Sequence, residues 1–435
     1  MRTRTVASVV FLLASLASAM LAQDAPAPAS SPTVSASAAP ATYTLTPEQR
    51  ARAIAYSRAR YGLHFAAFFW SVVVLVAIIA LRLGPRFRDR AEAVSRRRFW
   101  QAAVFVPLLF IADGVLELPT AVYGHHLQRF YGQSVQGWGS WMGDQVKGFL
   151  VGVAIAIPLV WLLYAILRRS PRRWWLWFWL ATLPILVFLI FVAPVLIDPL
   201  FFRFEPLAPK HPELASAIER VTVRAGERIP VDRMFSMNAS AKYNSINAYV
   251  TGLGASKRVV VWDTTIAKAT IPQTLFVFGH EMGHYVLAHI PKGIAFGWGM
   301  LFVLFALAAA VLGRLFRDRE RWGIRALGDW ASLPVILLFV TVAAELATPI
   351  VSGFVRRQEH QADVFGLEAI HGIVPDSPRA AAEAFQILGE ANLSDPEPSP
   401  FIRFWLYDHP PIAERQRFAA EYDPWSKGEA PRYVK

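Results

Sequence analysis

The sequence has no cysteine, and only 17% of its 435 residues are charged. Without thiols, the chain can form no disulfide, thiolate metal site or cysteine nucleophile, and cysteine usage says nothing about the redox compartment. The low charge also argues against an ordinary cytosolic enzyme, because a soluble domain usually has about a quarter of charged residues. Any metal site must therefore be built from histidine, aspartate or glutamate.

Apolar and aromatic residues are in excess. Hydrophobic residues make up 54% of the chain, and its 15 Trp and 30 Phe exclude a disordered protein. The net charge of +12 comes mostly from arginines in short blocks between apolar runs. A nucleic-acid-binding protein would spread its basic residues along one polar face, so no nucleic-acid partner is expected. Basic blocks that flank apolar runs are typical of membrane topology.

Six apolar runs are each long enough to cross about 30 Å of hydrocarbon. A large soluble core could mimic one such run, but six make that interpretation improbable. The runs are 62–81, 99–122, 148–167, 174–196, 293–313 and 330–354. The sequence therefore predicts a mainly α-helical, polytopic membrane bundle, with a four-span domain over 46–200 and two further spans over 293–354.

The N-terminal region has two interpretations. Residues 1–22 read as a basic start followed by an apolar run and small residues, which is typical of a secretory signal peptide. The same run can instead remain as a membrane anchor, which would raise the number of spans from six to seven. Residues 23–45 form an Ala/Pro/Ser-rich linker. A helix is expected over 46–60, with Thr46 as its N-cap.

The arginine blocks predict the orientation. They lie at 82–98, 168–173 and 314–325, and alternating spans place all three on one side of the membrane. Loops rich in arginine stay in the cytoplasm. The two polar segments, 201–292 and 355–435, are then expected on the extracytoplasmic side.

The segment 201–292 contains the elements of a small α+β domain. Its helical patterns and its stretches of β-forming residues are separated by Asn, Ser, Gly and Pro. Helices are predicted over 211–226 and 270–289, and short strands over 231–237, 248–251 and 258–262.

Residues 280–284 read His-Glu-Met-Gly-His, an HExxH motif within the second of these helices. Positions i and i+4 share one face of a helix, so His280 and His284 can hold one Zn²⁺ between them. Glu281 can reach a water molecule on that metal and act as a general base. The alternative is a helix with two incidental histidines.

A catalytic zinc needs a third protein ligand and an open coordination position. Glu359 and Asp363 follow the last span and are also separated by one helical turn. Glu359 can be the third ligand, while Asp363 orients a ligand histidine from behind. His360 is a competing ligand, although it would face away from Asp363. A solvated surface carboxylate is the other interpretation of Glu359.

An HExxH motif followed by Glu359-His360-Gln361-Ala362-Asp363 among membrane spans resembles the type I CaaX prenyl endopeptidases, which are integral-membrane zinc metalloproteases. The resemblance covers roughly residues 45–420. The other matching stretches are IDPLF at 197–201, FEPL at 204–207, NAY at 247–249, RVVVWDT at 258–264, the arginine pair at 356–357, and HPP at 409–411 with Arg415.

This resemblance implies a ring of membrane helices around a water-filled chamber, with a gluzincin-like α+β zinc peptidase domain formed by 201–292 and 355–435. One zinc ion would be bound by His280, His284 and Glu359, with Glu281 as the base. His409 would stabilise the oxyanion of the tetrahedral intermediate, which needs a donor aimed at developing charge. The substrate-binding residues would be Asn247, Ala248, Tyr249 and Arg415, with Asn247 at an edge where an extended peptide can add as a strand.

The function predicted is that of a zinc endopeptidase acting on peptides or proteins at the membrane. Prenylated CaaX C-termini are the substrates that the resemblance implies, and misfolded or membrane-associated polypeptides are the other class. A non-catalytic zinc-binding chaperone or quality-control protein is the alternative, although it would not need Glu281. A zinc-gated transporter is a third, but the chain lacks the paired, Gly/Pro-broken segments of inverted repeats. The sequence makes no prediction of the oligomeric state.

Overall fold

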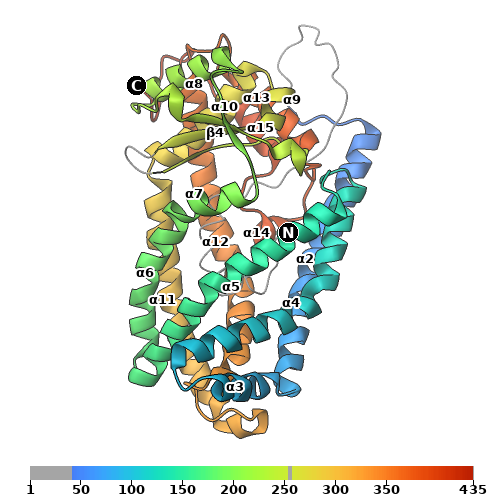
Figure 1. Ribbon diagram of the computed structural model, residues 1–435. Helices are drawn as coiled ribbons and strands as arrows, with labels where there is room; N and C mark the ends of the chain where they lie inside the picture. Colours follow the sequence, from blue (N-terminus) through green and yellow to red (C-terminus); the bar gives the residue numbers. More distant parts are fainter. Residues whose placement is uncertain (1–41, 253–256, 435) are drawn as a thin grey trace.

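The computed structural model describes residues 42–252 and 257–434. The expected signal peptide or anchor at 1–22, and most of the linker at 23–45, lie outside these residues. Long helices fill the lower part of the molecule in Figure 1, and a small sheet with shorter helices caps its upper end. The fold is mainly helical, as the sequence predicts.

The described residues contain six helices that are long and apolar enough to cross a membrane, which confirms the six predicted runs. Only 28% to 39% of the residues in their apolar windows are buried inside the protein. Most residues in these windows are therefore not fully buried by the protein itself. These helices are α2 (Pro47–Ala80), α4 (Arg98–Phe130), α5 (Trp138–Arg169), α6 (Trp174–Phe191), α11 (His289–Leu315) and α12 (Leu333–Ile370).

The first and the fourth spans have boundaries that differ from the prediction. The helix expected over 46–60 and the first span form one continuous helix, α2, because no Pro or Gly interrupts the chain before Gly62 and that glycine is tolerated. Thr46 caps this helix, and its capping box with Gln49 is complete. The fourth span ends at Phe191, and a short helix α7 (Ala193–Ile197) follows it. Pro194 has no amide hydrogen with which to continue the α6 ladder.

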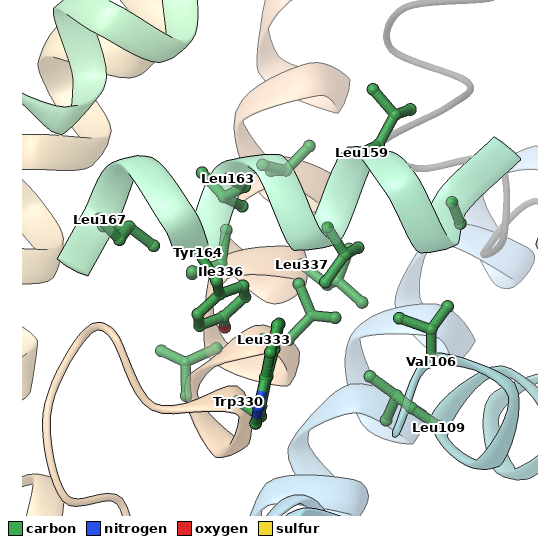
Figure 2. Close-up of a cluster of buried hydrophobic side chains, with 14 of the residues drawn as sticks. Val106, Leu109, Leu159, Leu163, Tyr164, Leu167, Trp330, Leu333, Ile336 and Leu337 are labelled. Atoms are coloured by element: carbon green, nitrogen blue, oxygen red, sulfur yellow. The ribbon is translucent and has the colours of Figure 1, made fainter. Parts of the chain in front are cut away.

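The membrane end of the protein is held by an apolar core around the start of α12. Trp330 is buried and packs against Phe105 of α4 and Tyr164 of α5. The Tyr164 hydroxyl lies 2.7 Å from Ser332 Oγ, which satisfies both buried groups. Figure 2 shows Leu163 of α5 in the same cluster as the leucines that begin α12. Since each large side chain buried in this way contributes about 1.5–3 kcal/mol, this cluster fixes the first turns of α12.

Helix α12 joins this core to a second one. It has 38 residues, so it is about 57 Å long, and residues 365–370 pack in the core of the upper domain. It contains Pro349, yet it continues past it as one helix. The other helices of the upper domain are α8 (Pro212–Arg224), α9 (Asp263–Lys268), α10 (Ile271–Val286), α13 (Ser377–Ala391), α14 (Pro400–Leu406) and α15 (Ile412–Glu421), and α3 (Leu83–Val94) lies at the opposite end of the molecule (Figure 1).

The sheet of the upper domain has four strands in the order β1-β2-β4-β3. They are β1 (Phe204–Pro206), β2 (Met234–Met237), β3 (Ala248–Thr251) and β4 (Arg258–Trp262). Strands β2 and β4 are parallel, and the other two pairs are antiparallel. The predicted strands 248–251 and 258–262 are confirmed with the same bounds. The strand predicted over 231–237 begins only at Met234, because 231–233 form a 3₁₀ turn, and the short strand β1 was not predicted.

Candidate metal centre

Helix α10 positions the HExxH motif. It begins after Thr270, whose backbone NH donates to Gln273 Oε1, and Pro272 lies in its first turn, where a missing amide hydrogen has no cost. His280 and His284 lie one turn apart on its buried side, with their Nε2 atoms 3.1 Å apart. The helix ends at Val286, before the predicted end at 289, because Ala288 adopts a left-handed conformation with φ 56°.

Glu359 of α12 completes a compact group with these histidines. Its Oε2 lies 3.2 Å from His280 Nε2, and its Oε1 lies 3.3 Å from His284 Nε2. Ligands at a tetrahedral angle around Zn²⁺, with bonds of about 2.0–2.1 Å, are separated by about 3.3–3.4 Å. The two Nε2 atoms, and each Nε2 with its nearer carboxylate oxygen, are therefore about as far apart as zinc ligands, and one ligand atom from each residue lies within 4.8 Å of the others. Two imidazoles with one carboxylate form a common catalytic zinc donor set. The residues fit the metal that the motif predicts.

Close contact between two helix backbones brings these ligands together. Gly283 of α10 faces Ala362 and Phe365 of α12, and a Cβ added to Gly283 would lie 3.1 Å from Ala362 Cα. A Cβ on Gly366 of α12 would lie 2.9 Å from the backbone nitrogen of His280. Only glycine fits at such an approach, and the approach lets the carboxylates of α12 reach the rings of α10.

We predict that Gly366→Ala weakens metal binding. The added methyl must push α12 away from His280, which costs about 1–3 kcal/mol of overpacking and moves Glu359 relative to the rings. A displacement of about 1 Å can lower catalytic activity by about 100-fold. Zinc affinity, thermal unfolding and peptidase activity would measure the effect. Gly353→Ala is the matched control on the same helix, because its Cβ would meet only Arg356 Nη2 at 3.6 Å. Equal zinc affinities in the two variants would contradict the prediction.

Asp363 lies behind His280. Its Oδ1 is 2.8 Å from His280 Nδ1, so the carboxylate accepts the Nδ1–H and leaves Nε2 with a lone pair toward the metal group. Arg415 of α15 donates to both oxygens of Asp363, at 2.9 Å from Nε and 2.6 Å from Nη2. The resemblance implies that Arg415 binds substrate, but the structure places it buried behind Asp363. We assign it the task of holding that carboxylate instead.

Glu281 follows the first ligand histidine along α10. Burial raises the pKa of its carboxyl group to about 7. A carboxylate with a pKa near neutrality can accept a proton and return it, which is what the predicted general base must do.

His409 lies at the edge of the metal group, in the turn between α14 and α15. Its Nε2 is 2.9 Å from Glu359 Oε2, and its Nδ1 is 2.7 Å from Asp408 Oδ1. Burial opposes its protonation, but these two carboxylates outweigh burial and raise the pKa of His409 to about 10. The imidazole is therefore held as a hydrogen-bond donor beside the ligands. Its role as oxyanion donor stays a prediction.

The other predicted substrate residues, 247–249, lie on or next to the edge strand β3. Asn247 is buried, and its Oδ1 has no hydrogen-bond partner among the described residues. Its backbone is fixed by Thr265, whose Oγ1 lies 2.6 Å from the Asn247 nitrogen and 2.7 Å from its carbonyl oxygen. The side chain of Ala248 is in the domain core, so only its backbone can meet a peptide, and Tyr249 packs in the small cluster with Trp262.

The sequence did not single out two residues behind the metal group. His289 Nδ1 lies 3.1 Å from His284 Nδ1, and Gln361 Oε1 lies 3.0 Å from His289 Nε2. The signal that could have found them is a histidine five positions after the motif and a glutamine between Glu359 and Asp363. The competing ligand His360 packs its ring against Phe418 and is not part of the metal group.

Two sequence profiles match nearly all of the described chain. The profile for the CAAX prenyl protease N-terminal region, five membrane helices, matches residues 33–203, and the profile for peptidase family M48 matches residues 208–423. The chain belongs to peptidase family M48. M48 enzymes are zinc-dependent metallopeptidases, so this multi-pass membrane protein is a metallopeptidase that acts on peptides or proteins. The described part of 33–203 holds four of the six candidate spans.

Known proteases are similar to this chain over most of its length. An uncharacterized metalloprotease of Bacillus subtilis, YhfN, is 34% identical over 378 residues, or 86% of each protein. The CAAX prenyl protease 1 of Saccharomyces cerevisiae is 28% identical and covers 83% of each. The human CAAX prenyl protease 1 homolog is 25% identical, covering 77% of this chain and 76% of its own.

One solved structure has the same fold over nearly its whole length. The crystal structure of Saccharomyces mikatae Ste24p superposes with a TM-score of 0.74 and covers 97% of this chain and 98% of its own. Its sequence identity is 22%, so this match shows the fold alone.

Proposed function

We propose that this M48 peptidase is a zinc endopeptidase that cleaves peptide bonds of membrane-associated polypeptides. The observation that carries the proposal is the group formed by His280, His284 and Glu359, with the carboxylate of Glu281 beside it. These three residues would hold the ion. When bound, zinc would polarise the substrate carbonyl and lower the pKa of a water molecule toward 7.

Glu281 would carry the proton. Hydrolysis of a peptide bond removes one proton from the attacking water and adds one to the leaving nitrogen. A single carboxylate can do both in turn when its pKa lies near the working pH. Burial keeps the carboxyl of Glu281 in that range.

Residues on both sides of the metal group would hold the substrate. His409 would donate its Nε2–H to the oxygen on which negative charge develops, because its other nitrogen is fixed by Asp408. An extended peptide would add to β3, whose outer side is the edge of the sheet. Asn247 would then use its buried Oδ1 to accept a backbone NH of the substrate.

We further propose that the peptidase end lies on the extracytoplasmic side. The arginine blocks at 82–98 and 314–325 contact each other, and the block at 168–173 contacts the chain just after the third block, all at the end of the molecule opposite α10 (Figure 1). Arg88 donates to the carbonyl oxygen of Gly323, and Arg168 donates to that of Gly328. Such a concentration of arginine is typical of cytoplasmic loops.

Protease accessibility would test this orientation. In sealed right-side-out vesicles, an added protease is expected to remove an epitope at the C-terminus. In inverted vesicles, the protease is expected to leave this epitope intact. A protease site engineered into the 3₁₀ segment at 316–322, between α11 and α12, is the control and should behave in the opposite way. Digestion of the C-terminal epitope only in inverted vesicles would refute the orientation.

The function itself is tested with detergent-purified full-length protein. We expect one zinc per chain, and a peptidase activity that a chelator removes and added zinc restores. A farnesylated CaaX peptide and the same peptide without the lipid separate the two substrate classes: preference for the first supports CaaX processing, and equal rates support cleavage of unmodified polypeptides. Stoichiometric zinc without turnover of any peptide would instead favour the chaperone alternative.

A further inference from the structure

The two histidines of the metal group are supported in different ways. Behind His280 lies a carboxylate, Asp363, which is itself paired with Arg415. Behind His284 lies another imidazole, since His284 Nδ1 and His289 Nδ1 are 3.1 Å apart. His289 is only 1% exposed.

If Nε2 of His284 is to bind a metal, the hydrogen bonds on its Nδ1 side can run in only one direction. A neutral imidazole has one donor and one acceptor nitrogen. If Nε2 of His284 keeps its lone pair for the cation, then Nδ1 carries the hydrogen and donates it to His289 Nδ1. His289 must in turn carry its hydrogen on Nε2, which therefore needs an acceptor. Gln361 Oε1 lies 3.0 Å from that nitrogen.

The backbone around His289 is built to bring its ring back toward His284. Ala288 adopts φ 56°, a left-handed conformation that a residue with a side chain rarely takes, and this break ends α10 and starts α11 at His289. Gln358 of α12 donates its amide to the His289 carbonyl oxygen at 3.4 Å. Two residues of α12 that are three positions apart thus contact His289: Gln358 bonds its backbone and Gln361 its ring.

We propose that His289 and Gln361 form a neutral hydrogen-bond relay that holds the ring of His284 in the tautomer and at the angle needed to bind the metal. Both are positioning residues. This inference rests on the proposed zinc site. The ring of His289 is not a fourth ligand, because it contacts the Nδ1 side of His284, and the metal group uses the Nε2 side.

The relay is tested by zinc affinity, measured on purified full-length variants by competition with a chromophoric chelator. Removal of a group that orients a metal ligand typically weakens metal affinity by about 10–100-fold. We expect that loss in His289→Leu and in Gln361→Leu. Gln361→Glu keeps an acceptor at the same place, so it is expected to escape the loss of about 10-fold or more that follows removal of an orienting group.

His360→Leu is the matched control, since it removes a neighbouring imidazole that contacts Phe418 and is not part of the metal group. Thermal unfolding in the presence of chelator compares the folds of the metal-free proteins. If the metal-free His289→Leu protein is unstable, the comparison of Gln361→Leu with Gln361→Glu tests the relay instead. Both of these variants keep His289, and only Gln361→Glu keeps a hydrogen-bond acceptor.

The outcomes are distinct. A wild-type protein that binds no zinc refutes the proposed function and the relay together. A wild-type protein that binds zinc, with His289→Leu binding it equally well, refutes the relay alone. Equal loss of affinity in Gln361→Leu and Gln361→Glu also refutes it, as does a second zinc per chain that disappears with His289.

Discussion

Glu281→Gln is expected to keep one zinc per chain and to lower kcat for peptide hydrolysis by about 10²–10⁴-fold. The amide has nearly the shape of the carboxyl group but cannot accept a proton from water. His280, His284 and Glu359 are unchanged, so the metal should remain. Zinc content and the rate of cleavage of a fluorogenic peptide, measured on the same preparation, separate the two effects.

Glu421→Gln is the control for this substitution. Glu421 is exposed at the end of α15 in the same domain, so its loss of charge should leave the rate unchanged. Cleavage by Glu281→Gln at the wild-type rate would show that another group accepts the proton. Loss of zinc from this variant would show that Glu281 acts as a ligand.

The parts of this protein that the sequence predicted are those in which one local pattern decides the structure. Six apolar runs became six long helices, because length and apolarity are sufficient to define a candidate span. The strands at 248–251 and 258–262 were found with correct bounds, since β-forming residues end there at clear breaks. The i, i+4 spacing of His280 and His284 placed both rings on one face of α10.

The parts that the sequence missed depend on tertiary contacts. Strand β1 has three residues and exists because β2 lies beside it. His289 follows a left-handed alanine, which no residue preference would indicate. Arg415 matched a family motif, but only the packing of α15 on α12 shows that it holds Asp363. The spacing of residues along one helix shows which of them share a face. It does not show which residues of α10, α11, α12 and α15 contact one another.

One helix therefore carries most of the supports of the metal group. Along α12, Glu359 contacts both histidines directly, Gln361 lies behind His284 through His289, and Asp363 lies behind His280. Because the first turns of α12 are fixed in the membrane core around Trp330, the ligands are held by a rigid element rather than by a loop. A site on such an element is positioned more accurately than one on a flexible segment.

Glu359→Gln is expected to remove the zinc itself. The substitution leaves two protein ligands and takes away the negative charge that faces the cation, so affinity should fall by at least about 100-fold, the upper end of the loss seen when only a supporting group is removed. At free zinc 100 times the wild-type Kd, binding stabilises the wild type by about 2.7 kcal/mol, and a 100-fold weaker variant by only about 0.4 kcal/mol. The rise in Tm on adding zinc should therefore almost vanish, together with peptidase activity.

Two variants make this result specific to Glu359. Glu281→Gln should keep the zinc-dependent rise in Tm while losing activity, so the two substitutions separate metal binding from proton transfer. His360→Leu should keep both, because its ring packs on Phe418. If Glu359→Gln still bound one zinc with wild-type affinity and His360→Leu lost it, the histidine would be the third ligand. The arrangement of Glu359 between the two imidazoles would then have to change when the ion binds, and α12 would have to rotate, which its close contact with α10 at Gly283 and Gly366 opposes.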